Sequence, residues 1–114
     1  EVIAGFADYS RIARAVAAET NTPLIDLEAL SRSWVARAGE DGAKRYYLHY
    51  APAAQPAFPS GIADDTHFSE LGARGAADLV AGGLERLRLP ISRAVRADRP
   101  DVRRATPLGR ADCR

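Results

Sequence analysis

The spacing of apolar residues in the first part of the chain predicts two helices joined by a short strand. The first helix is expected to begin at Asp8, which can cap it, and to end before Pro23. Residues 24–27 form a short, mostly apolar run of the kind that a buried parallel strand shows. The second helix is expected over residues 28–38, with Gly39 at its left-handed cap. Apolar residues recur at three-and-four spacing in both helices: Tyr9, Ile12, Ala13, Val16 and Ala17 in the first, and Leu30, Trp34 and Val35 in the second.

The order helix, strand, helix is typical of an α/β layered fold. A short helix around residues 41–46 and a proline-rich surface loop over residues 51–61 are expected next. The longest helix is expected to start near Ser69, a suitable cap, and to end at Pro90. Its apolar side carries Ala76, Leu79, Val80, Leu84 and Leu87.

The segment after residue 89 differs in composition from the rest of the chain. It is rich in arginine, is broken by Pro100 and Pro107, and has few large apolar groups. We therefore divide the chain into residues 1–89 and a disordered tail over residues 90–114. Nine arginines lie between Arg86 and Arg114, but they lack interleaved aromatic residues and any nucleic-acid-reading motif. A solvated tail is therefore favoured over a nucleic-acid partner.

Length and composition limit the possible classes of protein. The 114 residues, of which 46% are hydrophobic and 27% charged, suit one globular domain. No apolar run approaches the roughly 18 residues of a membrane-spanning helix, so we expect no membrane partner. Cys113 is the only cysteine, which excludes an intrachain disulfide and a Cys-rich zinc site.

A single predicted strand cannot form a parallel sheet, because its backbone groups need a neighbouring strand. The chain also begins at Glu1 and contains no methionine, as a processed product or a piece of a protein would. We therefore expect residues 1–89 to be the C-terminal portion of a larger α/β domain, with the missing N-terminal half as their partner.

Asp64 and His67 form an Asp-x-x-His pattern just before the longest predicted helix. An imidazole is the usual general base for a hydroxyl nucleophile, and a carboxylate on its other ring nitrogen fixes the tautomer. In a tight turn, Asp64 can reach the ring of His67 and leave the far nitrogen free. Pairs of this kind are common, and many are purely structural.

The surrounding residues make the pattern more specific. Residues 64–73 read Asp-Asp-Thr-His-Phe-Ser-Glu-Leu-Gly-Ala. This segment resembles the last conserved block of the SGNH (GDSL) hydrolases, most closely the rhamnogalacturonan acetylesterase branch. The resemblance extends over roughly residues 8–91. It implies the C-terminal portion of a three-layer α/β/α, flavodoxin-like domain, mostly helical within this chain and with one buried parallel strand.

The resemblance also implies roles for the residues of this segment. His67 would be the base that deprotonates a serine, and Asp64 the carboxylate that orients its ring. Thr66 would brace the turn through a bond between its side chain and the backbone, which is a structural role. Asp65 lies at a variable position and is expected to be exposed near the start of the helix.

The nucleophile block and the oxyanion hole of the family have no counterpart in this sequence. None of the available serines stands in such a context: Ser10, Ser31, Ser33, Ser60, Ser69 and Ser92. Base and carboxylate without a nucleophile supply little rate, so the chain alone is expected to be inactive.

Two other groups of residues have simpler interpretations. His49 and His67 are the only histidines, and no metal is expected because they lack a ligand spacing such as His-x-x-x-His. The aromatic run over residues 46–50 is interpreted as packing, with one wall of a sugar-binding groove as the alternative. Trp34 is also expected to pack in the core.

The resemblance therefore predicts a serine esterase that removes acetyl groups from a carbohydrate such as rhamnogalacturonan, without a cofactor. A general GDSL lipase or lysophospholipase shares the same residues and is an alternative. A non-catalytic fragment or binding module is another. The sequence does not assign a location, although a secreted or periplasmic enzyme would suit a polysaccharide substrate.

Overall fold

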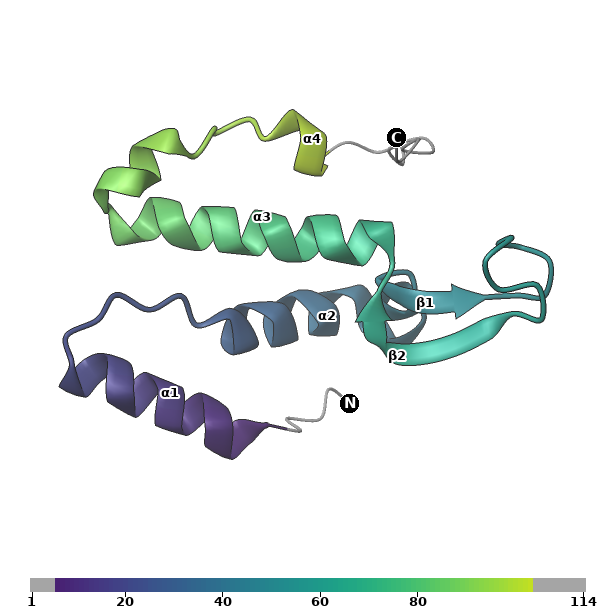
Figure 1. Ribbon diagram of the computed structural model, residues 1–114, viewed down its shortest axis with the longest axis horizontal. Helices are drawn as coiled ribbons and strands as arrows, with labels where there is room; N and C mark the ends of the chain where they lie inside the picture. The colour runs from purple at the N-terminus through teal and green to yellow at the C-terminus, as the bar shows by residue number, and fades with distance from the viewer. Residues whose placement is uncertain (1–5, 104–114) are drawn as a thin grey trace.

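The computed structural model describes residues 6–103, and residues 1–5 and 104–114 lie outside the described part. In chain order the elements are α1 (Ala7–Glu19), α2 (Leu27–Lys44), β1 (Tyr47–Tyr50), β2 (Ile62–Phe68), α3 (Glu70–Leu87), the 3-10 helix η1 (Pro90–Ala94) and α4 (Pro100–Arg103). Helices α2 and α3 lie side by side, and the β1–β2 hairpin projects from the end where α2 stops and α3 starts (Figure 1). The chain is α/β, as predicted.

Helix α1 lies apart from the other helices (Figure 1). It starts at Ala7, and Phe6 at the N-cap position offers no side-chain acceptor, so the prediction that Asp8 caps the helix is wrong. Asp8 lies in the first turn instead, where its charge suits the helix dipole. Arg14 links α1 to the start of α2 through Asp26 at 2.7 Å and Glu28 at 2.8 Å.

The predicted strand over residues 24–27 has no strand partner among the described residues, and Leu27 already belongs to α2. Asp26 has φ −74° and ψ 75°, and the Leu27 amide donates to the Ile25 carbonyl at 2.8 Å. This inverse γ-turn is common where a strand ends. The described chain offers residues 24–26 no neighbouring strand to complete a ladder.

Helices α2 and α3 follow the sequence predictions closely. The Asp26 side chain caps α2, and Gly39, at φ 71°, interrupts it before a last short helical stretch. Ser69 caps α3, which ends at Leu87. The two helices approach closely, because a Cβ atom at Gly75 would lie 2.2 Å from the Trp34 ring. Trp34 is half-buried and also stacks on Tyr46 at a centroid distance of 4.0 Å.

The antiparallel hairpin of β1 and β2 was not predicted from the sequence. Its strands pair Leu48 with Asp64, His49 with Ala63 and Tyr50 with Ile62. The proline-rich residues 51–61 connect them as an irregular loop, as expected. The signal in the sequence was the aromatic run before that loop, since aromatic residues favour strands.

Residues 90–103 differ from the predicted disordered tail, because they form η1 and α4 and contact α3. The Arg99 guanidinium binds Asp78 at 2.6 Å and Glu85 at 3.0 Å, and Arg103 binds Asp78 at 2.9 Å. Burial alone would raise the pKa of Asp78, but the hydrogen bonds from Arg99 and Arg103 outweigh it and leave that pKa lowered. The rest of the predicted tail lies outside the described residues.

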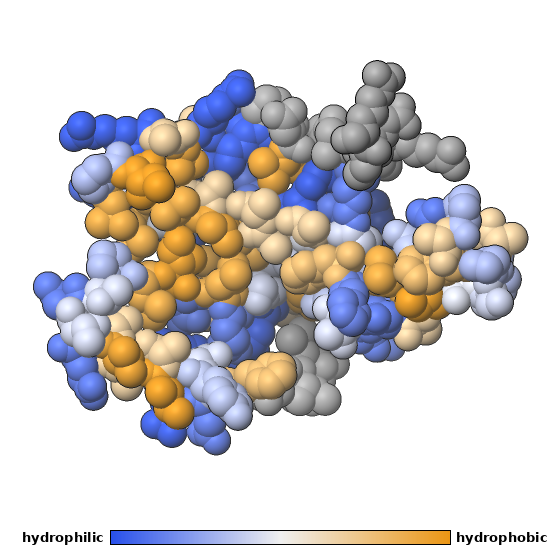
Figure 2. Space-filling view, in the orientation of Figure 1, coloured by the Kyte–Doolittle hydropathy of each residue, from blue (hydrophilic) through white to orange (hydrophobic). Residues whose placement is uncertain are grey.

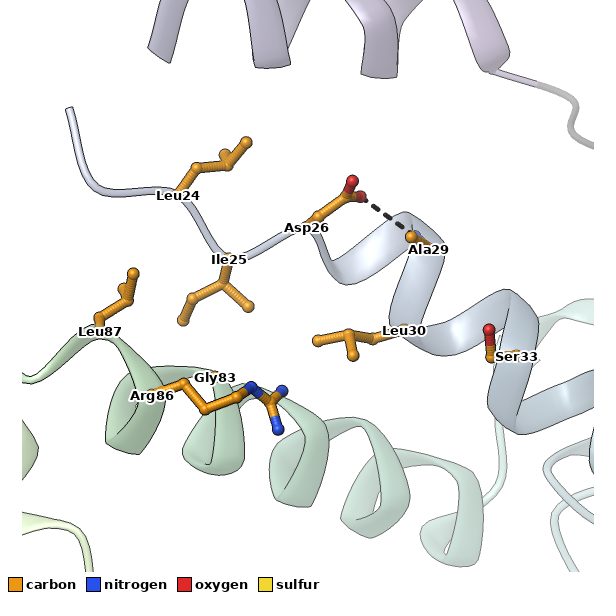
Figure 3. A pocket seen from close by; sticks show the side chains of 9 residues that line it. All are labelled: Leu24, Ile25, Asp26, Ala29, Leu30, Ser33, Gly83, Arg86 and Leu87. Carbon is orange, nitrogen blue, oxygen red and sulfur yellow. Dashed lines mark hydrogen bonds between the residues drawn. The ribbon is translucent and has the colours of Figure 1, made fainter. Parts of the chain in front are cut away.

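The described residues contain no buried hydrophobic side chain. The radius of gyration is 16.6 Å, whereas a compact domain of this length would have about 13 Å. Apolar residues gather on the surface over α2 and α3 (Figure 2). A pocket of about 380 Å³ lies between residues 24–33 and the end of α3, with Leu24, Ile25, Leu30 and Leu87 in its wall (Figure 3).

Within residues 6–103, no helix has the length and apolar content needed to cross a bilayer.

We expect the isolated chain to have helical circular dichroism but a broad, poorly cooperative melt, because burial of apolar surface drives cooperative unfolding. Circular dichroism and calorimetry against temperature measure this. A single sharp transition with equal calorimetric and van't Hoff enthalpies would contradict the expectation.

Candidate active site

Asp64 and His67 lie in β2, at a place where the strand is irregular. In a regular strand, residues three apart are about 10 Å apart and point to opposite faces. Here the register jumps, because Leu48 pairs with Asp64 while the adjacent Tyr47 pairs with Phe68. Residues 65–67 therefore form a bulge without partners in the register. The bulge supplies the tight turn that brings Asp64 and His67 together.

The Asp64 carboxylate accepts three hydrogen bonds within this bulge. One oxygen, Oδ1, accepts from the backbone amides of Thr66 at 2.7 Å and His67 at 2.9 Å. The other, Oδ2, lies 2.7 Å from Nδ1 of the His67 ring. The same carboxylate thus shapes the backbone turn and holds the ring.

This contact determines which nitrogen of the His67 ring is free. An ionised carboxylate only accepts hydrogen bonds, so Nδ1 carries the proton and donates it to Asp64. The neutral ring then has its lone pair on Nε2, which has no hydrogen-bond partner among the described residues. The His67 side chain is 73% exposed, whereas that of Asp64 is 24% exposed. The arrangement offers an oriented, accessible base.

Hydrogen bonding keeps Asp64 ionised. The backbone amide of His67, its ring and the backbone amide of Thr66 together lower the pKa of Asp64 from 3.8 to about 2. Asp64 therefore carries its charge at neutral pH, where it orients the ring and would stabilise a charged imidazolium.

The start of α3 holds the bulge from its C-terminal side. Ser69 is buried, donates its hydroxyl to the Arg45 carbonyl at 2.6 Å and accepts from the Gly72 amide at 3.1 Å. Its own amide donates to the Tyr46 carbonyl at 2.9 Å. A Cβ atom at Gly72 would lie 1.9 Å from that carbonyl oxygen, so only glycine fits there.

Thr66 and Asp65 take part in ways that sequence reasoning did not foresee. Thr66 contributes its backbone amide, and its hydroxyl has no hydrogen-bond partner within residues 6–103. Asp65 is exposed, as expected, but its Oδ1 accepts from Nε2 of His49 at 2.7 Å. The two residues are 16 positions apart and meet only because the hairpin forms.

The remaining candidate residues lie around the bulge or away from it. Phe68 is exposed and its ring lies 5.5 Å from that of Tyr47, while Tyr50 stacks on Phe58 at 6.2 Å. No hydrogen bond joins His67 to a serine hydroxyl within the described residues. Among residues 6–103, no three His, Cys, Asp or Glu side chains come together in a way that could hold a metal ion.

Comparison with known proteins identifies the relatives of the chain. It is 40% identical over 84 residues to rhamnogalacturonan acetylesterase RhgT of Bacillus subtilis (strain 168), a match over 74% of this chain and 36% of that protein. The chain is a homologue of rhamnogalacturonan acetylesterases. It is also 34% identical over 94 residues to the probable rhamnogalacturonan acetylesterase YesY of the same organism, over 82% of this chain and 39% of that protein.

These matches confirm the predicted resemblance to the rhamnogalacturonan acetylesterase branch. The chain spans less than two fifths of the length of either relative. No family model and no solved structure matches the chain.

The close approach at Gly72 predicts that Gly72→Ala loosens the turn before α3. Overpacking commonly costs about 1–3 kcal/mol, so exchange of the Ala73 amide, which bonds to the Ser69 carbonyl, should quicken by about tenfold or more. Gly82→Ala is the matched control, because a Cβ atom there meets nothing closer than 3.8 Å. Equal exchange rates in the two variants, followed by NMR, would contradict the contact.

The hydrogen bonds to Asp64 predict how the bulge responds to acid. Because the folded-state pKa of about 2 lies below the ordinary 3.8, the stabilisation is complete above pH ~4 and is lost as the pH falls toward 2. A ¹³C NMR titration of the Asp64 carboxyl measures this. His67→Ala should raise the midpoint only in part, because both backbone amides remain, and an ordinary midpoint in the unaltered chain would contradict the geometry.

Proposed function

We propose that this chain carries the base and the orienting carboxylate of a serine esterase that removes acetyl groups from a carbohydrate. The observation that carries the proposal is the 2.7 Å contact between Asp64 and Nδ1 of His67, which leaves Nε2 accessible. The relatives are named as rhamnogalacturonan acetylesterases, which supports an acetyl ester on a polysaccharide as the substrate.

The proposal places the nucleophile and the oxyanion hole in chain outside this sequence. Two observations support a larger domain: the match to only 36–39% of the relatives, and the lack of any buried hydrophobic side chain in the described residues. In the proposed whole domain, a three-layer SGNH fold, residues 24–27 would pair with neighbouring strands. The open pocket beside Leu24 and Ile25 would then be covered.

In the first chemical step, Nε2 of His67 takes the proton of a serine hydroxyl as the serine oxygen bonds to the acetyl carbon. The carbonyl π electrons move to oxygen, and donors of the oxyanion hole bind the charge. The carbonyl then re-forms and the bond to the sugar oxygen breaks. That oxygen receives the proton from Nε2 and leaves as an alcohol, so the serine remains acetylated.

In the second step, a water molecule gives a proton to Nε2 while its oxygen bonds to the acyl carbon. The serine oxygen then leaves with that proton, and acetic acid is released. Asp64 holds Nδ1 throughout and stabilises the imidazolium that forms in each step. This route needs neither a metal nor an organic cofactor.

The closest alternative is a GDSL lipase or lysophospholipase, which would use the same two residues on a lipid ester. The names of the relatives favour the carbohydrate substrate. A non-catalytic module is the alternative from another class. Comparing turnover of acetylated rhamnogalacturonan with that of a lysophospholipid separates the two esterases, and lack of turnover on both would favour the module.

In the full-length protein, His67→Ala should lower kcat/KM for an aryl acetate by about 10³-fold or more, because the serine loses its base. Asp8→Asn is a matched control, since it removes an exposed carboxylate on α1 that pairs with Arg11. Steady-state kinetics measure both variants. Near-normal turnover by His67→Ala would show that another group acts as the base.

A further inference from the structure

A second pair of Asp and His side chains lies next to the first, with its carboxylate in the bulge of β2 and its imidazole on β1. Asp64 binds His67 within the bulge, whereas Asp65 binds His49 across the hairpin. His49 lies on β1 opposite Ala63, one residue before the Asp64 that begins the bulge. Two neighbouring carboxylates thus bind two different imidazoles.

The exposed fractions of the two side chains show that His49 is the anchor and Asp65 the residue that it holds. The His49 side chain is only 21% exposed, while that of Asp65 is 86% exposed. His49 therefore sits in the surface of the hairpin and Asp65 reaches out to it. Because an ionised carboxylate only accepts, Nε2 of His49 is the donor, the opposite nitrogen to the one that His67 uses.

This cross-strand bond reaches a part of β2 that the ladder leaves unsupported. Residues 65–67 have no partner in the register. Asp64 stabilises the turn from within, but its own bonds do not fix the bulge relative to β1. Among the described residues, the bond from His49 to Asp65 is the only side-chain hydrogen bond between β1 and the bulge.

We propose that His49 is a positioning residue, which anchors Asp65 to β1 and thereby fixes the direction in which Nε2 of His67 points. The inference rests on the proposed function, because a direction matters only where a nucleophile must meet that nitrogen. His49 touches neither the substrate nor the reacting atoms. Its effect is on the fraction of molecules in which the base is aligned.

The size of the effect follows from the exposure of Asp65. A hydrogen bond to an exposed carboxylate contributes little to stability. His49→Ala also removes a largely buried ring, but in Asp65→Ala loss of the anchor should leave the melting temperature almost unchanged. It should lower kcat by roughly fivefold, with KM unchanged, since the fraction of aligned base falls and substrate binding does not.

The experiment uses the full-length protein labelled with ¹⁵N-histidine. His49→Ala and Asp65→Ala are compared with His49→Gln, whose amide can still donate to Asp65, and with Asp8→Asn, an exposed carboxylate on α1 that pairs with Arg11. Three quantities are measured: the proton NMR signal of Nδ1–H of His67, kcat and KM for an aryl acetate, and the melting temperature. The His67→Ala variant assigns the signal.

The proposal expects both alanine variants to shift or broaden the His67 signal and to lower kcat, and expects His49→Gln and Asp8→Asn to resemble the unaltered protein. An unchanged His67 signal in His49→Ala would overturn it. So would a loss of kcat in Asp65→Ala that follows a matching fall in melting temperature. If the unaltered protein does not hydrolyse acetyl esters, the proposed function fails, while the NMR signal still decides whether His49 positions His67.

Discussion

The Asp64 carboxylate is the constraint on which the site depends. It accepts two backbone amides and one ring nitrogen, so a single group closes the turn, selects the ring tautomer and remains ionised. In a regular strand residues 64 and 67 would point to opposite faces, so Asp64 could neither close this turn nor reach the His67 ring. The contact from Asp64 to His67 therefore depends on the bulge, and the bonds from the backbone amides to Asp64 stabilise the bulge in turn.

Local features of the sequence predicted most of the helical structure. The cap at Ser69, the interruption at Gly39 and the spacing of apolar residues all act within a few positions. They therefore leave a readable pattern. Asp8 shows the limit of that approach, because a capping residue one or two positions inside the helix gives the same sequence signal as one at the cap.

Contacts between distant residues were harder to predict. The bond between His49 and Asp65 depends on hairpin register, which no motif records. The sequence signal of the hairpin was the aromatic-rich run over residues 46–50, which was interpreted as packing. The predicted strand over 24–27 stays a prediction, since no strand partner for it lies among the described residues. By contrast, the pairing of Asp64 with His67 lies within four positions and could be foreseen.

The ion pairs around Arg99 cover one flank of α3 and leave the two sides of the molecule different in polarity. Helix α3 lies between α2 and residues 90–103, whose arginines bind Asp78 and Glu85 (Figure 1). One flank of α3 is thus closed by the chain itself. Among residues 6–103, six of the eight large exposed apolar residues come before Glu28: Phe6, Tyr9, Ile12, Val16, Leu24 and Leu27. The exposed apolar surface of the described residues therefore lies mainly on α1 and on the segment that enters α2, on the side of the molecule away from the arginine cluster (Figure 1).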